Sequence, residues 1–355
     1  MTDYILEIYT LNASTGVYTR IGELSTYFNL NWTKIANKPA KCTFSMNSYS
    51  KEGNLIQPFK NWVLIKRNGL AEYFGNIIDV KGFHSSDSGQ IDITCGDILY
   101  ALNNLYTVGS YVKQNIDAGA LVTDLITVAQ AKSYGNFGLQ AGGIETIGTT
   151  NETLFYQSIG KAITNQSDNI VGFDVSFVPI LDGNGELSYI QYNVYKALGT
   201  VRNNLPPLEL GYSVNLISFG MLNEVKNKIY TLGSGTGFDV SVATSTGTTQ
   251  SAGYSLREAV NKEGSVSILQ TLQDKGDTFL SDNQGVKLEL GFQLTEGQRP
   301  YYGDFGLFDT LPVKIEIGNT FFNFNGTAQI RELAFTYDNN TNKETITPII
   351  QYNKV

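Results

Sequence analysis

The sequence predicts a mainly β fold with α+β insertions, in which one sheet motif is built twice. The chain has 21 Tyr, 19 Phe and 36 Gly against 2 Trp, and such a composition favours strands and turns over helices. A similar block of strand signals occurs near both ends of the chain. Helical periodicity is confined to a few segments between these two blocks.

The repeated block reads in both places as a strand, a long strand entered near a glycine, a polar turn and a returning strand. The first copy comprises residues 62–67, 72–80, 85–89 and 91–94. The second copy comprises residues 313–317, 322–337, 338–342 and 345–347. A chain that builds one sheet motif twice is expected to mimic a symmetry higher than its own subunit count.

Length and charge limit the possible functions. A chain of 355 residues is long enough for roughly two to three domains with real cores. We place these domains at residues 1–102, 103–215 and 216–355, with a helical and strand insertion at 255–295. Charged residues make up 16%, below the usual ~25%, which fits either a surface hidden in an assembly or one rich in Asn, Thr and Ser. The net charge of −8 disfavours a general DNA-coating role.

Several protein classes are disfavoured by what the chain lacks. Cys42 and Cys95 are the only cysteines. Two thiols cannot build a multi-bridge disulfide framework or a four-cysteine zinc site, so we predict two buried free thiols. No apolar run approaches ~20 residues, so stable membrane insertion is not expected. The chain starts with strand-like residues and no basic leader, so we expect no secretory signal.

The first hundred residues are predicted to be almost entirely strands. Residues 28–32 and 42–46 alternate apolar and polar side chains with the period of two that half-buried strands show. In the first strand, Glu7 would face away from the apolar side. Asn68-Gly69 between apolar runs predicts a type I′ hairpin, because both central residues of that turn need positive φ.

The middle of the chain is predicted to mix helices and strands. One helix opens at Ile116-Asp117, with the Asp near its positive N-terminal end. A second helix follows Thr150 as its N-cap. The glycine-rich segment between these helices, 133–149, is expected to be a loop. Two strands joined by a turn follow, at residues 171–177, 187–195 and 182–185.

The last third is predicted to return to sheet. A strand at 226–232 leads into a Gly-, Ser- and Thr-rich segment, 233–253, which we expect to be a mobile loop because it has few large apolar side chains. Ser255 and Glu258 have capping-box spacing and predict a short helix that ends near Asn261. A further helix and a strand are predicted at residues 268–280 and 286–290.

No pattern in the chain selects catalytic, cofactor-binding or metal-binding residues. His84 is the only histidine; it has no signature partner for a Ser-His-Asp or Cys-His site, and no zinc spacing to either cysteine. The glycines at 233–237 precede a strand-like segment, which favours a loop over a phosphate cradle. The turn at 182–186 lacks the spacing of an EF-hand. A carboxylate pair for glycan cleavage stays open, because nothing selects one.

Several short features follow one another in a recognisable order. A hairpin at 63–69 precedes an "aromatic-x-G-x-I" strand at 73–77 and a strand that enters a "D-x-L-x-x-L" helix at 91–102. Later come an "N-x-I-x-x-x-G" strand, a "Y-x-x-R-E" segment and a "G-D" pair, at residues 227–233, 254–258 and 301–304. This order, over roughly residues 1–350, resembles that of the baseplate hub and tail-associated (tail tip) proteins of tailed phages and related injection machines.

The resemblance implies two barrel-like β domains, related by pseudo-duplication, which combine in a homotrimer to form a pseudo-hexameric ring. Such a ring would match a hexameric tail tube to a threefold tip. The expected place is the virion, at the distal end of the tail, after synthesis in the host cytoplasm. Longer members of the family carry a C-terminal lytic or receptor-binding extension. Because this chain ends just after the second block, such an activity is expected to come from another polypeptide.

The leading hypothesis is therefore a structural, non-enzymatic hub that closes or extends the distal tail tube for genome ejection. Its expected partners are its own copies, the distal tail or tail-tube ring protein, the tape-measure protein, and other tail-tip or receptor-binding proteins. No cofactor is expected. DNA would touch the ring only in transit, past a neutral or acidic inner wall that does not retain it. Two alternatives stay open: a β-rich carbohydrate-binding adhesin at the tail tip and, more weakly, a cell-wall-degrading tail enzyme.

Overall fold

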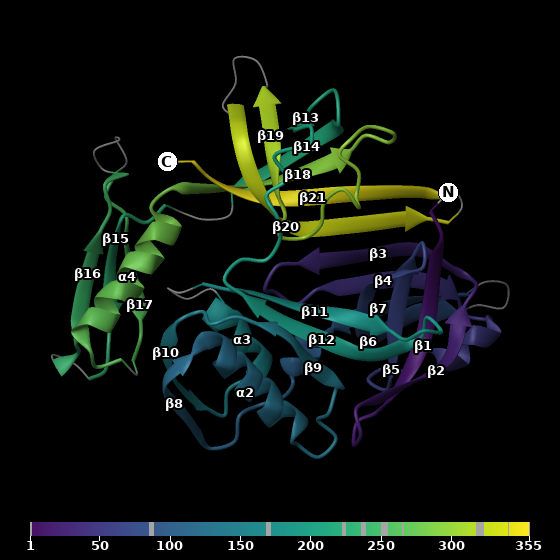
Figure 1. Ribbon diagram of the computed structural model, residues 1–355, viewed down its shortest axis with the longest axis horizontal. Helices are drawn as coiled ribbons and strands as arrows, with labels where there is room; N and C mark the ends of the chain where they lie inside the picture. The colour runs from purple at the N-terminus through teal and green to yellow at the C-terminus, as the bar shows by residue number, and fades with distance from the viewer. Residues whose placement is uncertain are drawn as a thin grey trace.

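The computed structural model describes residues 2–84, 89–167, 172–221, 225–235, 239–249, 255–264, 266–316, 323–339 and 341–354. The strands among these residues form one long sheet of 13 strands and three small sheets (Figure 1). The fold is mainly β with few helices, as the sequence predicted. The predicted turn of the first block lies mostly outside the described residues, at 85–88.

The first seven strands form what we call the N-terminal block. Their order in the sheet is β3-β4-β7-β6-β5-β1-β2. The strands are β1 (Tyr4–Asn12), β2 (Val17–Leu24), β3 (Tyr27–Ile35), β4 (Lys41–Asn47), β5 (Asn61–Arg67), β6 (Leu70–His84) and β7 (Gly89–Asp97). A 3-10 turn η1 (Lys51–Leu55) and a short helix α1 (Ile98–Leu102) accompany them. Asn68 and Gly69, with φ of 50° and 80°, join β5 to β6 as the predicted hairpin.

A middle unit of two helices and five strands follows. Its elements are β8 (Ser110–Asp117), α2 (Ala118–Gln130), β9 (Leu139–Ile144), β10 (Thr149–Phe155), α3 (Ile159–Ser167), β11 (Asp174–Leu181) and β12 (Leu187–Tyr195). Asp117 caps α2 through hydrogen bonds from the amides of Gly119 and Ala120, which confirms the predicted helix start. The hairpin of β11 and β12 is also confirmed.

Two predictions for the middle unit are wrong. No helix follows Thr150, because residues 149–155 pair with β8 as β10, and α3 begins only at Ile159. The alternation of exposed and covered side chains along β10 suits a strand better than a helix. The predicted loop at 133–149 contains β9, which pairs in parallel with β12. Its two glycines, Gly142 and Gly143, let β9 approach side chains of β12 too closely for any Cβ.

The C-terminal block completes the long sheet. Its strands are β13 (Leu208–Glu209), β14 (Val214–Met221), β18 (Val286–Leu294), β19 (Thr310–Glu316), β20 (Asn323–Asp338) and β21 (Lys343–Lys354). They lie in the order β14-β18-β21-β20, with β19 between β20 and β13. Antiparallel pairing of β20 with β3 joins this block to the N-terminal block.

A small projecting unit interrupts the C-terminal block between β14 and β18. It consists of β15 (Lys228–Leu232), β16 (Val242–Thr246), β17 (Glu258–Lys262) and α4 (Leu269–Asn283). It stands to one side of the other units (Figure 1). The predicted strand at 226–232 and the helix at 268–280 are confirmed.

Two other predictions for the projecting unit are wrong. The expected loop at 233–253 contains β16, which pairs with β15, while 236–238 and 250–253 lie outside the described residues. The capping-box helix is absent from its described residues, because 258–262 form β17. Buried Asn227 explains this outcome: its side chain binds the carbonyl of Ser255 and the amide of Arg257, which holds that stretch extended.

The buried apolar side chains of the described residues form two hydrophobic cores. One lies between the N-terminal and C-terminal blocks and contains Trp32 and Phe335, whose rings are stacked with centroids 4.5 Å apart. The other lies between the N-terminal block and the middle unit and contains Trp62 and Phe74. The N-terminal block therefore lies between two layers, which explains why six consecutive residues of β5 are buried.

Candidate functional site

The two blocks share one strand order. In the N-terminal block the order β3-β4-β7-β6-β5 is antiparallel at every step. In the C-terminal block the order β14-β18-β21-β20-β19 is also antiparallel at every step. The strands that correspond in these two rows also follow the same order along the chain. The repeated motif predicted from the sequence therefore corresponds to a repeated topology of five strands.

The long central strands of the blocks, β6 and β20, also have equivalent irregularities. Asn76 is the last residue of β6 that pairs with β5, and the register with β7 shifts at Ile78. Gln329 is the last residue of β20 that pairs with β19, and the register with β21 shifts at Arg331. In both strands the bulge therefore lies two residues beyond the end of the preceding pairing. Bulges bend a strand and increase its twist, so both long strands change direction at the same point.

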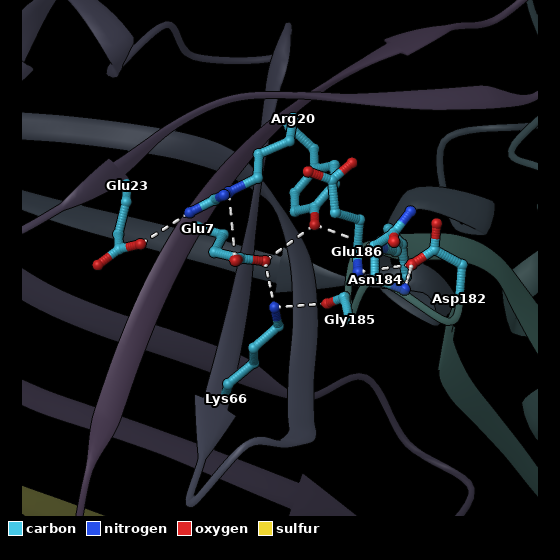
Figure 2. Close-up of polar contacts among 10 residues, drawn as sticks. Glu7, Arg20, Glu23, Lys66, Asp182, Asn184, Gly185 and Glu186 are labelled. Carbon is cyan, nitrogen blue, oxygen red and sulfur yellow. Dashed lines mark hydrogen bonds and ion pairs between the residues drawn. The ribbon is translucent and has the colours of Figure 1, made fainter.

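A buried polar cluster fastens the middle unit to the N-terminal block. Figure 2 shows Glu7 of β1 at its centre, between Lys66 of β5 and Arg20 of β2. The Glu7 carboxylate lies 2.7 Å from Lys66 Nζ and 3.2 Å from Arg20 Nε. Lys66 Nζ also donates to the carbonyl of Gly185, at 2.6 Å, in the turn between β11 and β12. The ammonium group of Lys66 therefore connects a strand of the N-terminal block to a turn of the middle unit.

Tyr9 adds a second link to the same cluster. Its hydroxyl donates to Glu7 Oε2 at 2.9 Å and accepts from the amide of Leu187 at 3.0 Å. Burial raises the pKa of Tyr9 well above its usual range. Glu7 is only 4% exposed, so its charge is stabilised by these partners rather than by water. The prediction that Glu7 points away from the apolar side of its strand is correct. The face of the strand on which Glu7 lies is, however, covered by the middle unit.

Further polar junctions join the middle unit to both blocks. Arg331 of β20 donates to Asp174 of β11 at 3.2 Å. Asn37, in the turn after β3, is 4% exposed and bonds the carbonyl of Phe173 and the amide of Val175. Such buried and satisfied contacts favour a single relative arrangement of the units. The sequence offered no signal for them, because each partner lies far away along the chain.

A cavity of about 350 Å³ lies where the N-terminal block meets the middle unit, and its lining includes Lys34, Glu72 and Asp97. Lys34 bonds both Glu72 and the hydroxyl of Tyr302. Asp97 caps α1 and accepts from the amides of Tyr100 and Ala40. Burial raises the pKa of Asp97 to about 7, against the opposing effect of these amides. The polar groups of this cavity are thus engaged in joining elements of the fold.

The two cysteines, His84 and the turn at 182–186 lie within or between strands. Cys42 and Cys95 are buried free thiols on neighbouring strands, as predicted, and burial raises the pKa of Cys42. His84 ends β6, and its side chain lies outside the described part of the chain. The turn after β11 is a hairpin turn in which Asp182 accepts from the amides of Asn184 and Glu186.

The described residues lack a metal-binding cluster and a membrane-spanning helix. No group of three or more His, Cys, Asp or Glu side chains there converges as a metal site would. Among those same residues, no helix has the length and apolar character needed to cross a membrane.

One end of the middle unit exposes aromatic side chains. Phe155 and Tyr156 are 71% and 58% exposed, and their rings meet edge to face with centroids 4.8 Å apart. Tyr106, which is 52% exposed, lies on the segment that pairs with Ser158 nearby. Exposed aromatic groups of this kind are typical of surfaces that bind a partner or a sugar.

The fold is shared with tail proteins of phages. The 43 kDa tail protein of prophage MuSo2 from Shewanella oneidensis is 13% identical, with 98% of each chain covered and a TM-score of 0.63. Prophage tail protein gp18 from Listeria monocytogenes EGD-e is 13% identical over 99% of this chain and 95% of that chain, with a TM-score of 0.57.

A component of a secretion system is also similar. The E. coli c3393 protein, a part of the type VI secretion system with structural similarity to the T4 tail proteins gp27 and gp5, is 9% identical. The match covers 94% of this chain and 78% of that chain, with a TM-score of 0.50. No protein-family model and no curated protein matches the sequence. The resemblance to tail proteins of phages is thus confirmed at the level of the fold.

Proposed function

We propose that this chain, which has the fold of phage tail proteins, is a structural hub of a tail tip or baseplate: a trimeric adaptor that closes or extends the distal tail tube. The observation that carries the proposal is the repeated five-strand topology within a single sheet. Two equivalent blocks in one chain give six equivalent positions in a trimer. A threefold component can then contact a sixfold ring at each of its positions.

The buried junctions support this role. The clusters around Glu7 and Asp174 hold the middle unit to the blocks, so the chain would act as one rigid part. An adaptor benefits from rigidity, because the angle between its two blocks sets whether a ring can close. We include in the proposal the division into domains at 1–102, 103–215 and 216–355, the barrel-like character of the first and third, and their origin by duplication.

The proposed surroundings follow from the same role. The partners would be two further copies of the chain, a tail-tube ring protein, the tape-measure protein and other tail-tip or receptor-binding proteins. The place would be the distal end of the tail in the virion. DNA would only pass through the channel, along a wall that is neutral or acidic. The role would be non-enzymatic; the chains that share the fold are named as tail proteins of prophages.

Native mass spectrometry on the full chain over a range of concentrations tests the proposal. A species near 117 kDa, three times the 39.0 kDa of one chain, is expected at high concentration. Addition of the tail-tube ring protein from the same phage should increase its population, because each ring offers six matching sites. A chain that stays monomeric at every concentration, with and without the ring protein, would contradict the proposal.

The exposed aromatic group at Tyr106, Phe155 and Tyr156 favours one second candidate, a carbohydrate-binding adhesin at the tail tip. A glycan array probed with the full chain and with Tyr156→Ala separates the two roles. Binding lost in the variant would support the adhesin, and an array without signal would count against it. A turbidity assay on purified cell walls tests the weaker alternative of a wall-degrading enzyme, for which clearing of the suspension is required.

A further inference from the structure

The second half of β6 has an unpaired edge. Residues 70–76 of β6 pair with β5 on one side, whereas beyond the bulge at Ile78 the strand pairs only with β7 among the described strands. In the equivalent part of β20, residues 332–337 pair with β3 on that same side. The N-terminal block thus lacks the neighbour that the C-terminal block has at the equivalent edge.

Strand β14 has the complementary unpaired edge. It is the terminal strand of the long sheet and pairs with β18 on one side. On its other side, the described residues offer only a bridge between Leu210 and Val214. Its counterpart β3 uses that side to pair with β20. Within one chain, β3 pairs with the second half of β20. Their equivalents, β14 and the second half of β6, have no such partner among the described strands.

We propose that these two edges pair between chains: β14 of one copy lies antiparallel to the second half of β6 of the next copy. This inference rests on the proposed trimer and names the surfaces that close it. The joint repeats between chains what β3 and β20 form within a chain. The partner strand at each edge thus comes from a second copy of this protein. Every copy has one edge of each kind, and the two edges have matching topology.

The exposure of side chains on β6 supports the view that this strand lacks a neighbour that β20 has. Past the bulge of β20, Leu333 and Phe335 are 0% and 1% exposed in the core shared with β3. At the equivalent positions of β6, Val80 is half-buried and Gly82 is exposed, and the next residue, Phe83, is 60% exposed. Unpaired strand edges and exposed aromatic side chains both favour association with another chain.

The register of the proposed joint follows from two equivalent rows of paired residues, one across each block. Each row starts at the first residue after the bulge of the long strand and continues, from partner to partner, across three further strands. In the N-terminal block it consists of Asp79, Thr94, Thr43 and Asn31. In the C-terminal block it consists of Glu332, Ile349, Gly291 and Ser218. Asn31 of β3 and Ser218 of β14 are therefore equivalent positions.

The internal joint then predicts individual contacts. Thr336 lies opposite Asn31 and is the fifth residue after its bulge. Phe83 is the fifth residue after the bulge of β6. Phe83 of one chain should therefore lie opposite Ser218 of the next, with their Cβ atoms about 4.5–5.5 Å apart. Two residues along the same pairing, Lys81 should lie opposite Gly220.

Such a joint is heterologous, because each chain contributes a different edge on each side. Heterologous contacts either close into a ring or continue as a filament. A ring of three chains alternates three internal joints with three joints between chains, and all six involve equivalent strands. The two kinds of joint would then need nearly equal rotations, which the matched bulges of β6 and β20 favour.

Disulfide cross-linking tests the joint. The full chain carrying Phe83→Cys and Ser218→Cys is concentrated, oxidised with copper phenanthroline and run on a denaturing gel without reductant. The natural cysteines are fully buried, so the introduced thiols are the reactive ones. We expect cross-linked dimers and closed trimers, with the bond between positions 83 and 218 identified by peptide mass spectrometry. Each single variant should remain uncross-linked, because positions 83 and 218 do not meet their own copies.

Asp79→Cys with Ser218→Cys provides the matched control. In the proposed register Ser218 lies opposite Phe83, and Asp79 is four residues from Phe83 along β6. Positions 79 and 218 are then separated by about 13 Å along the strand and should not cross-link. A trimer by native mass without an 83–218 bond, or equal bonding in the control, overturns the strand assignment and leaves the trimer intact. Dimers from either single variant would indicate a twofold contact and also overturn it. A chain that is monomeric at all concentrations overturns both proposals.

Discussion

Arg67 on β5 and Glu344 on β21, 277 positions apart in the chain, form a two-pronged ion pair: Nε and Nη2 donate to different carboxylate oxygens, each at 2.7 Å. The hydroxyl of Tyr4 donates to the same carboxylate. The two charged side chains are 16% and 13% exposed. The pair joins the N-terminal block to the C-terminal block near the ends of both strands, and it raises the pKa of Arg67 through the hydrogen bond to Glu344.

We expect Glu344→Ala to lower the free energy of unfolding by about 2–3 kcal/mol, because it leaves the Arg67 charge poorly hydrated. Arg67→Lys keeps the charge but loses the planar fork, and should cost about 1 kcal/mol. Urea denaturation followed by circular dichroism measures both. Lys314→Met, which breaks the more exposed pair with Glu209, should leave the free energy of unfolding almost unchanged, because water hydrates both partners. Equal effects of the buried and exposed changes would contradict this view of the joint.

Lys66 should control how firmly the middle unit is attached. Lys66→Met removes both the ion pair with Glu7 and the bond to the Gly185 carbonyl, and leaves Glu7 with Arg20 as its remaining cation. We expect a loss of about 3 kcal/mol and faster hydrogen exchange at the turn between β11 and β12. Hydrogen exchange with mass spectrometry measures the local effect.

The control for this prediction uses a lysine of the middle unit itself. Lys113 pairs with Asp124, and these side chains are 36% and 34% exposed. Lys113→Met should cost about 0.5 kcal/mol or less and leave exchange at the β11–β12 turn unchanged. Unaltered exchange at that turn in Lys66→Met would show that the cluster does not hold the unit in place.

The elements that were predictable from sequence are those with local causes. The Asn68-Gly69 hairpin follows from the φ angles of two residues, and the start of α2 follows from the cap at Asp117. The repeated motif was visible because strand, turn and returning strand leave a pattern over about thirty residues. The correspondence of β14 and β18 with β3 and β4 was not visible in the sequence, because the projecting unit separates β14 from β18 by more than sixty residues.

The predictions that were wrong concern segments whose structure is set by distant partners. Ser255 and Glu258 satisfy the spacing of a capping box, but the buried Asn227 side chain binds the groups that a helix would have used. Thr150 resembles an N-cap, but its neighbours pair with β8. The polar junctions were invisible for the same reason. Glu7 is an ordinary outward residue of a strand until the middle unit covers it.

Asp97 should make stability depend on pH. Burial raises its pKa to about 7 from an ordinary value of 3.8, so the folded chain favours the protonated acid. The stabilisation from this proton is complete below pH 3.8 and is lost as the pH rises through 7. Asp97→Asn keeps an acceptor for the cap of α1 without the titration. Relative to this variant, the natural protein should lose up to roughly 4 kcal/mol between pH 4 and pH 8.

Unfolding curves of both proteins at several pH values check this expectation. The difference between the two proteins removes the contribution of the other titrating groups, because these are common to both. A difference that stays constant from pH 4 to pH 8 would mean that the amides of Tyr100 and Ala40 keep the carboxylate charged in the folded state, contrary to the expectation.

The stack of Trp32 on Phe335 should be the main apolar contribution to the joint between the blocks. The rings are parallel within 6°, both side chains are 1% exposed, and their residues lie opposite each other in the pairing of β3 with β20. Phe335→Ala should cost about 3–5 kcal/mol, because a large buried ring is replaced by a cavity that rigid strands cannot fill. Phe155→Ala, at a site 71% exposed, should cost about 0.5 kcal/mol or less. Because both blocks share this core, the tryptophan fluorescence and the circular dichroism of the sheet should change in one transition in the natural protein. A loss below about 1 kcal/mol in Phe335→Ala, or two separate transitions in the natural protein, would show that the blocks fold as independent units.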